Sequence, residues 1–135
     1  MPTIRRATIA DIKSVAALVE EQLFKGVGVE QRVRRMIECS PETCFVAIDQ
    51  HCVGVLLSMF NGFHVVLSHM AVHEAHQGRG VGRALHDALV ECAESLGAIG
   101  VITDSWLGAT GFYVKLGYRL PGAVFLIRDL KSRAL

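Results

Sequence analysis

The amino-acid sequence predicts a mixed α+β fold, in which a central mixed sheet made of an antiparallel meander plus one parallel crossover is flanked by four helices. Three observations lead to this prediction. Apolar residues recur at helical spacing between positions 12 and 37, and strand-like apolar runs follow between positions 44 and 73. A long amphipathic pattern and a further apolar run then occupy positions 81–103. A succession of strand, helix and strand implies a right-handed crossover between parallel strands.

The N-terminal part is expected to hold a short strand, Ile4 to Ala7, and two helices. Thr8, with Asp11 three residues later, is typical of a capping pair at the start of a helix. The first helix would bury one apolar face: Ile12, Val15, Ala16, Val19 and Leu23. The second would do the same: Val29, Val33, Met36 and Ile37. Pro41 ends this second helix, because the residue before a proline is biased away from helical conformation.

Three strands are expected next. Cys44 to Ile48 and Cys52 to Phe60 are rich in apolar and β-branched residues, and a polar turn separates them. Asn61-Gly62 joins the second run to a third, Phe63 to His73, and Asn-Gly between apolar runs is the strongest short-range hairpin signal. These three strands predict the antiparallel meander.

The C-terminal half contains the most regular helical pattern of the chain. Its apolar positions lie on one face: Val81, Ala84, Leu85, Ala88, Leu89, Cys92 and Leu96. A fully apolar strand, Ile99 to Thr103, follows, and then a short helix around Ala109 to Leu116. A last hairpin through Pro121-Gly122 is expected to join Tyr118–Leu120 to Val124–Arg128.

The composition limits the classes of protein to which the chain can belong. Its 135 residues have the usual length of one globular domain, and we expect a single domain over residues 1–135. Fourteen Lys and Arg against thirteen Asp and Glu give a formal charge of +1, which disfavours nucleic-acid binding through bulk charge. The longest nearly unbroken apolar run, Val53 to Phe60, is far shorter than the roughly 18 residues that a membrane span needs. We expect neither a nucleic-acid nor a membrane partner.

The N-terminus and the cysteines favour a cytoplasmic location. Polar Thr8 and Asp11 stand where a signal peptide would carry its apolar stretch. The four cysteines have none of the close spacings of a zinc ribbon or a redox pair. We therefore expect reduced, buried thiols in a cytoplasmic protein.

A glycine-rich loop between the meander and the long helix is the clearest candidate binding site. Gly78, Gly80 and Gly82 stand at alternate positions, so backbone N–H groups can converge without interference from Cβ atoms. The helix that follows adds its positive N-terminal end, and Arg79 and Arg83 add charge. The pattern favours an anion such as a pyrophosphate over the alternative, a tight connection that needs glycine for steric reasons alone.

Two common phosphate-binding motifs fit this loop poorly. A Walker loop requires Lys and then Ser or Thr after its last glycine, whereas Arg83 and Ala84 follow Gly82. A Rossmann fingerprint would require glycine at Arg83 or Leu85, and it would follow a mononucleotide-binding half instead of an antiparallel meander. Asp104, about 20 residues further on, keeps a pyridine-dinucleotide protein open as a distant alternative.

Two segments resemble the signatures of one enzyme superfamily. The run from Met70 to Leu85, MAVHEAHQGRGVGRAL, resembles the acyl-CoA signature of the GNAT superfamily of N-acyltransferases. The core of that signature is Q/R-x-x-G-x-G/A. The run from Phe112 to Tyr118, FYVKLGY, resembles its second signature. The expected element order is also similar over nearly the whole chain. The resemblance implies a GNAT-like fold and an N-acetyltransferase that moves an acetyl group from acetyl-CoA to a primary amine of a small molecule or protein, by direct attack on the thioester.

The resemblance also implies where acetyl-CoA binds as co-substrate, with no metal. CoA would lie between two neighbouring parallel strands, and Met70, Ala71 and Val72 would pair their backbone with its pantetheine arm. The Met70 N–H would polarise the thioester carbonyl. Core packing of these apolar side chains is compatible with such contacts, because the contacts use the backbone. The implied contacts of the pyrophosphate are Gln77, Gly78, Arg79, Gly80, Val81, Gly82 and Arg83.

Tyr113 matches the family tyrosine that protonates the departing CoA thiolate. A phenol with a pKa near its usual value of about 10 stays protonated at neutral pH and can act as this acid. The alternative is a tyrosine that packs on the inner face of a short helix, beside Phe112 and Leu116.

The sequence does not select one general base, because the glutamate that many relatives carry on the central strands is absent. His64 and Ser68 are expected on the face of the strand that carries Met70. His69 is expected on the opposite face, and Asp104 at a strand end. A water-mediated path for the proton is an equal alternative to each of these residues as the general base.

Two further features concern the site. Trp106 stands where relatives often have an asparagine that contacts CoA, and an indole could line the acceptor pocket or pack in the core. His69, His73 and His76 lie on a strand that runs into a loop, where three rings do not converge on one point, so we expect no metal.

Two expectations about partners follow. The absent glutamate and asparagine motivate an alternative to the enzyme, a non-catalytic acyl-CoA-binding regulatory module. The last predicted hairpin carries four apolar residues in succession, more than an exposed edge should hold, so we expect it to pair or pack in a homodimer. These residues are Val124, Phe125, Leu126 and Ile127.

Overall fold

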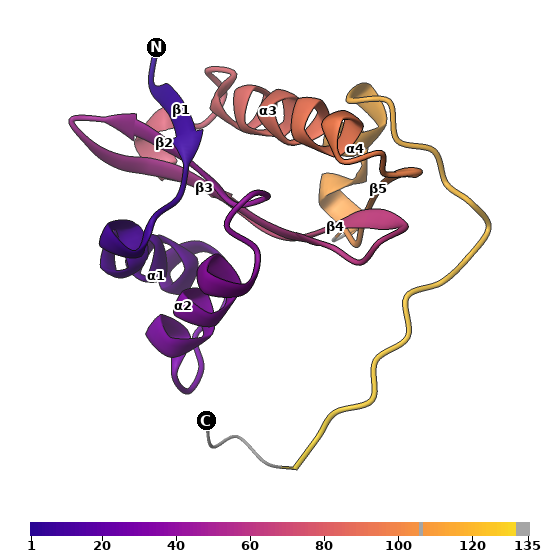
Figure 1. Ribbon diagram of the computed structural model, residues 1–135, viewed down its shortest axis with the longest axis horizontal. Coiled ribbons are helices and arrows are strands. Elements are labelled where there is room, and N and C mark those ends of the chain that lie inside the picture. Colours follow the sequence, from indigo (N-terminus) through magenta and orange to yellow (C-terminus); the bar gives the residue numbers. More distant parts are fainter. Residues whose placement is uncertain (106, 132–135) are drawn as a thin grey trace.

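The computed structural model describes residues 1–105 and 107–131, and it shows one five-stranded sheet with helices on both faces (Figure 1). The strands are β1 (Thr3–Arg6), β2 (Phe45–Asp49), β3 (His51–Phe60), β4 (His64–Val72) and β5 (Gly100–Thr103). The α-helices are α1 (Ile12–Gln22), α2 (Val29–Cys39), α3 (Val81–Ser95) and α4 (Thr110–Lys115). Short 3₁₀ turns add η1 (Ile9–Asp11), η2 (Glu74–His76) and η3 (Leu107–Ala109).

The sheet combines antiparallel and parallel pairing, as the sequence predicts. The strands lie in the order β1-β2-β3-β4-β5, and each of the first three pairs antiparallel with the next. β5 pairs parallel with β4, after the crossover through α3. The Asn61-Gly62 turn forms as expected, and the Asn61 side-chain oxygen accepts hydrogen bonds from the N–H groups of Phe63 and His64. The predicted fold class is therefore confirmed.

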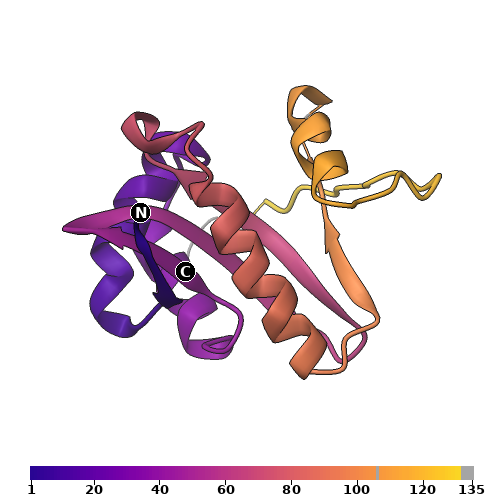
Figure 2. The same ribbon diagram turned by 90° about the horizontal axis from the view of Figure 1, so that it is seen from above.

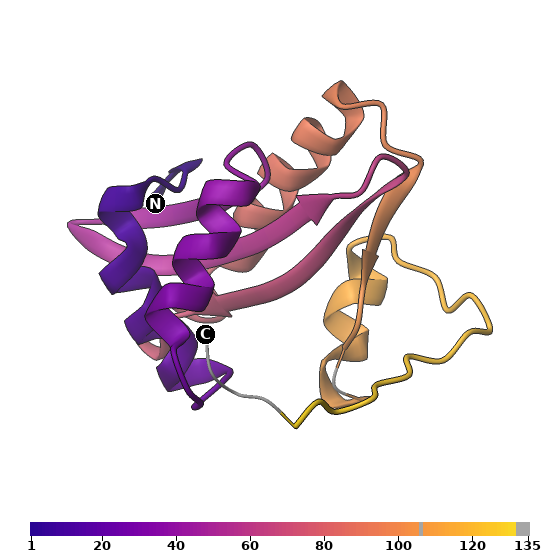
Figure 3. The same cartoon turned by 60° about the horizontal axis from the view of Figure 1, so that its bottom comes forward.

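Two apolar clusters hold the helices against the sheet. α1 and α2 cover one face, and α3 crosses the other (Figures 2 and 3). The first cluster includes Ile12, Val15, Val33, Ile37, Val55 and Leu57. The second includes Val53, Leu56, Val65, Leu67, Leu85 and Leu89. The central strands are apolar on both sides because helices cover both faces of the sheet.

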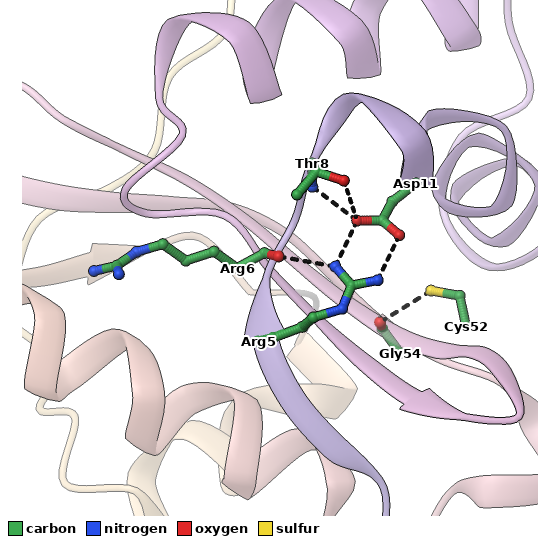
Figure 4. Close-up of polar contacts among 6 residues, drawn as sticks. All are labelled: Arg5, Arg6, Thr8, Asp11, Cys52 and Gly54. Carbon is green, nitrogen blue, oxygen red and sulfur yellow. Dashed lines mark hydrogen bonds and ion pairs between the residues drawn. The ribbon is translucent and has the colours of Figure 1, made fainter.

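The junction between β1 and α1 is fixed by one carboxylate (Figure 4). The Asp11 Oδ2 atom accepts hydrogen bonds from the Thr8 backbone N–H at 2.7 Å and the Thr8 hydroxyl at 3.2 Å. The Arg5 guanidinium approaches both carboxylate oxygens, at 2.8 and 2.9 Å. The predicted pairing of Thr8 with Asp11 at the helix start is confirmed, and Arg5 is a further partner that the sequence did not reveal.

A β-bulge interrupts β4. Leu57 lies opposite His69 while Ser58 lies opposite Leu67, so Ser68 has no partner residue on β3. Opposite the bulge, buried Ser58 is fully engaged with Thr43: its hydroxyl donates to the Thr43 carbonyl at 2.6 Å and its carbonyl accepts from the Thr43 hydroxyl at 2.8 Å. One extra residue shifts the alternation of all later β4 residues by one position.

The last predicted hairpin is wrong: the described residues after α4 contain no strand. The segment of residues 118–131 runs away from the sheet in an extended path (Figure 1). Its apolar side chains are largely exposed, with Val124 at 80%, Phe125 at 71% and Ile127 at 75%. Apolar composition predicts a strand only where another strand can satisfy the backbone and bury the side chains, and a single copy of the chain provides neither here.

No helix among the described residues combines the length and the apolar character needed to cross a membrane.

Candidate functional site

β4 and β5 separate partway along their length. β5 pairs with His64–Leu67 of β4 and ends at Thr103, whereas β4 continues to Val72. The Thr103 hydroxyl donates to the Leu67 carbonyl at 3.2 Å, at the last paired position. Among the described residues, no strand lies beside the edge of β4 beyond Leu67 on the β5 side.

The bulge decides which backbone groups reach this free edge. His73 donates its N–H to the Val53 carbonyl at 2.8 Å, so the alternating pattern turns the backbone groups of Ala71 towards β3. Met70 and Val72 then direct their N–H and C=O groups to the free edge. The Gln77 side chain donates to the Val72 carbonyl at 2.9 Å, which shows that this carbonyl points outward.

Ala71 thus departs from the expectation that three successive residues offer their backbone to pantetheine. Its backbone groups face Val55 of β3, and its side chain is buried in the cluster beneath α1 and α2. Adjacent residues of a strand point to opposite edges, so at most Met70 and Val72 can meet a ligand at this one.

The glycine-rich loop joins this edge to the N-terminus of α3. Gly78 and Gly80 have positive φ angles of 74° and 83°, which favour glycine strongly. Gly82 has a different role: it lies in α3, and a Cβ there would be 3.4 Å from the Phe112 ring of α4. Buried Val81 anchors the start of the helix in the core.

The loop has the chemistry of an anion site. The first N–H groups of a helix lack partners within it, and those of α3 follow directly on Gly80. Gln77, Arg79 and Arg83 are exposed, and neither arginine forms an ion pair within the part of the chain that the structure describes. Unpaired arginines beside unpaired N–H groups leave positive charge available to a ligand.

Tyr113 lies on α4 and is half-buried against the cluster beneath α3. Its ring packs edge-on with the rings of Phe112 and Tyr118, at centroid distances of 5.2 and 5.4 Å. Burial raises the pKa of Tyr113, while hydrogen bonding with the Thr103 side chain opposes this shift and the charge of Asp104 adds to it. Tyr113 is therefore protonated at neutral pH and lies beside Thr103, where β5 separates from β4.

Buried His86 and half-buried Tyr118 form a polar pair that the sequence did not reveal. The His86 Nε2 atom lies 2.7 Å from the Tyr118 hydroxyl. Burial lowers the pKa of His86 and raises that of Tyr118, so both are uncharged at neutral pH. One signal was available: His86 follows Gly82 by four residues, which places it on the side of α3 that meets α4.

The candidate bases do not lie as expected. The bulge separates Ser68 from the face of Met70: its hydroxyl lies 3.5 Å from the Met36 sulfur of α2 and 3.0 Å from the His69 Nδ1 atom. The expectation that Ser68 and His69 face opposite sides is therefore wrong. His64 lies at the far end of β4, paired with Gly100.

The other histidines of this region have local partners. His73 Nδ1 accepts the Ala75 N–H at 3.2 Å, and His76 Nε2 lies 3.5 Å from Asp49. No group of three metal-ligating side chains occurs among the described residues. Trp106 lies outside them.

Comparison with known families identifies the class of protein that this fold and loop define. Residues 40–120 match the acetyltransferase (GNAT) domain, which covers more than half of the chain. The chain belongs to the GNAT acetyltransferase family. A comparison with curated protein sequences finds no match.

Solved structures share the fold over nearly the whole chain. The aminoglycoside N-acetyltransferase AAC(6')-Iy, in complex with a bisubstrate analog, is 15% identical, with a TM-score of 0.81 over 96% of this chain and 99% of its own. Ribosomal-protein-alanine N-acetyltransferase from Brucella melitensis is 17% identical, with a TM-score of 0.76 over 96% and 99%. Glucosamine-6-phosphate N-acetyltransferase from Arabidopsis thaliana is 16% identical, with a TM-score of 0.76 over 98% and 99%.

Proposed function

We propose that this chain is an acetyl-CoA-dependent N-acetyltransferase that transfers the acetyl group to a primary amine of a small molecule or a protein. One observation carries the proposal: the free edge of β4, with the outward backbone groups of Met70 and Val72, leads directly into the glycine-rich loop at the start of α3. The pantetheine arm of CoA is an extended chain with amide groups that leads to a pyrophosphate. Its amides can pair with the free edge of β4, and the pyrophosphate can then lie at the glycine-rich loop.

The donor would bind along this path. The pantetheine arm pairs with the backbone groups of Met70 and Val72, and it displaces the Gln77 side chain from the Val72 carbonyl. The pyrophosphate lies against the N–H groups that follow Gly78, with Arg79 and Arg83 at the rim.

Transfer itself is a direct attack on the thioester. The neutral amine adds to the carbonyl carbon, and the Met70 N–H donates to the oxygen as negative charge develops there. The C–S bond then breaks, and the departing thiolate takes the hydroxyl proton of Tyr113. The added nitrogen releases its extra proton to solvent, and solvent returns a proton to the phenolate, so that a neutral amide and the free CoA thiol remain.

Three fold relatives support an amine acceptor without selecting one. Their names specify an aminoglycoside, the alanine of a ribosomal protein and glucosamine 6-phosphate. These acceptors share an amino group and little else, so we propose no acceptor more specific than a primary amine.

A non-catalytic acyl-CoA-binding module is the second candidate. The observation that favours it is the absence of glutamate from β4 and β5. A module would bind the donor as the enzyme does and would turn over no amine.

Donor binding is tested by thermal unfolding. Acetyl-CoA at one hundred times its Kd should stabilise the native state by about 2.7 kcal/mol, and NAD at the same concentration should not. No shift at millimolar acetyl-CoA would refute both the enzyme and the module.

A further inference from the structure

The bulge of β4 places two polar side chains in contact beside the free edge. The Ser68 hydroxyl is 3.1 Å from the Leu57 carbonyl and 3.5 Å from the Met36 sulfur, both of which can only accept a hydrogen bond. It is also 3.0 Å from the His69 Nδ1 atom. His69 immediately precedes Met70, whose N–H faces the edge.

Competition for the Ser68 proton favours one tautomer of His69. The Ser68 hydroxyl has one proton, and the Leu57 carbonyl and the Met36 sulfur compete for it as acceptors. With that proton donated away from the ring, the hydroxyl oxygen accepts from a protonated Nδ1 of His69. The neutral imidazole then carries its free lone pair on Nε2.

The Nε2 atom of His69 is available. It has no hydrogen-bond partner among the described residues, and it is not among their buried unpartnered atoms, so solvent reaches it. Partial burial lowers the pKa of His69, and the opposing field of Asp104, just beyond β5, is the smaller effect. The ring is therefore neutral at pH 7, as a proton acceptor must be.

We propose that His69 is the general base of the reaction, a role that rests on the proposed acetyl transfer. Its Nε2 lone pair takes one proton from the acceptor ammonium, which leaves a neutral amine with the electron pair that forms the new C–N bond. The resulting imidazolium keeps its Nδ1–H bond to Ser68 and later releases the Nε2 proton to water. Ser68 is a positioning residue, because it fixes the ring and the tautomer.

The variant His69→Gln tests this role, because glutamine can still donate to Ser68 but does not titrate near neutrality. With a primary amine that the wild type acetylates, kcat at pH 7 should fall about 10²- to 10⁴-fold while the Kd of acetyl-CoA is unchanged. The rate should recover towards high pH, where more of the amine is already neutral. The control His64→Gln, at the far end of the same strand, should keep the wild-type profile.

Nitrogen NMR of the histidine rings gives a second readout that needs no substrate. We expect His69 as the Nδ1–H tautomer, titrating below 6.5, and a tautomer mixture in Ser68→Ala. An Nε2–H tautomer in the wild type, or a ring charged at pH 7, would overturn the assignment.

The outcomes separate this role from the proposed function. Wild-type protein that binds acetyl-CoA but acetylates no amine would refute the transferase and the base together. An active wild type whose His69→Gln variant keeps the same rate and pH profile would refute only the role of His69.

Discussion

At the scale of single residues, Tyr113 packs against two aromatic rings and carries the proposed proton donor. Tyr113→Phe keeps the ring contacts with Phe112 and Tyr118 and removes the proton donor. We expect kcat to fall about a hundredfold or more, near 3 kcal/mol of barrier, with the Kd of acetyl-CoA unchanged. Steady-state kinetics at saturating substrate, with direct binding of acetyl-CoA, measures this split.

Tyr118→Phe is the matched control for Tyr113→Phe. It removes the partner of buried His86 and should lower the free energy of unfolding by about 1–3 kcal/mol, while kcat stays within a few-fold of the wild type. Equal rates of the wild type and Tyr113→Phe would show that Tyr113 only packs in the core and donates no proton.

The lowered pKa of Asp11 makes the stability of the fold depend on pH. The hydrogen bonds from Arg5 lower the pKa of Asp11 below its usual 3.8 in the folded state, against the opposing effect of burial. A lowered folded-state pKa adds stability above pH 3.8 that is lost as the pH falls through the folded-state value. Asp11→Asn should lower the free energy of unfolding by about 1–3 kcal/mol at pH 7 and by less in acid.

Urea unfolding at pH 7 and near pH 3 measures this difference. Glu38→Gln is the control, because the ion pair of Glu38 with Arg34 is half-exposed on both sides and should contribute little. An equal loss for Asp11→Asn at both pH values would show that the carboxylate charge is not the stabilising feature.

At the scale of elements, the loop before α3 carries the donor. Gly80→Asp places a side chain and a negative charge where the pyrophosphate should meet backbone N–H groups, in open space that reaches only the Met1 side chain, at 3.9 Å. We expect the variant to remain folded and to lose acetyl-CoA binding by calorimetry.

Gly97→Asp is the matched control for the loop. Gly97 follows the other end of α3, has a positive φ of 73° and also has open space around it. This variant carries the same change of charge and similar backbone strain, and it should bind acetyl-CoA like the wild type. Normal binding by Gly80→Asp would place the pyrophosphate elsewhere.

Elements differ in how far the sequence predicts them. The apolar periodicities predicted the four α-helices and five strands of the described residues within a few residues, because burial on a helix or strand face leaves a direct trace in the sequence. They also predicted two strands after α4 that do not form. The bulge at Ser68 left no such trace. It depends on pairing with β3, and strict alternation along β4 therefore misplaced Ser68.

The pairs Arg5–Asp11 and His86–Tyr118 escaped prediction for a related reason. Their members lie in different segments of the chain, and only tertiary packing brings those segments together. Tyr113 and the glycines of the loop were recognisable because each lies within a short local motif.

At the scale of the whole molecule, the segment after α4 leaves apolar side chains exposed. Residues 118–131 expose a run of apolar side chains. β5 is an edge strand on which Ile102 is 46% exposed, and Ile99, just before it, is 74% exposed. We propose that this segment lies along β5 of a second copy, in a homodimer. Exposed apolar runs and open strand edges both favour such pairing.

Light scattering measures the dimer. The wild type should have twice the mass of one chain at high micromolar concentration, and Phe125→Asp should shift it to the monomer. Leu107→Asp, which changes a side chain that is 94% exposed on η3, should stay dimeric. A wild type that is monomeric throughout would refute this assembly.

We propose that this fold moves an acetyl group and does not merely hold its donor. The most direct test is release of the CoA thiol from acetyl-CoA over a panel of primary amines, with the acetylated product identified by mass spectrometry. We predict thiol release that depends on one class of amine and is lost in Gly80→Asp. Tight binding of acetyl-CoA with no thiol release above the rate without amine would contradict transfer and leave a binding module.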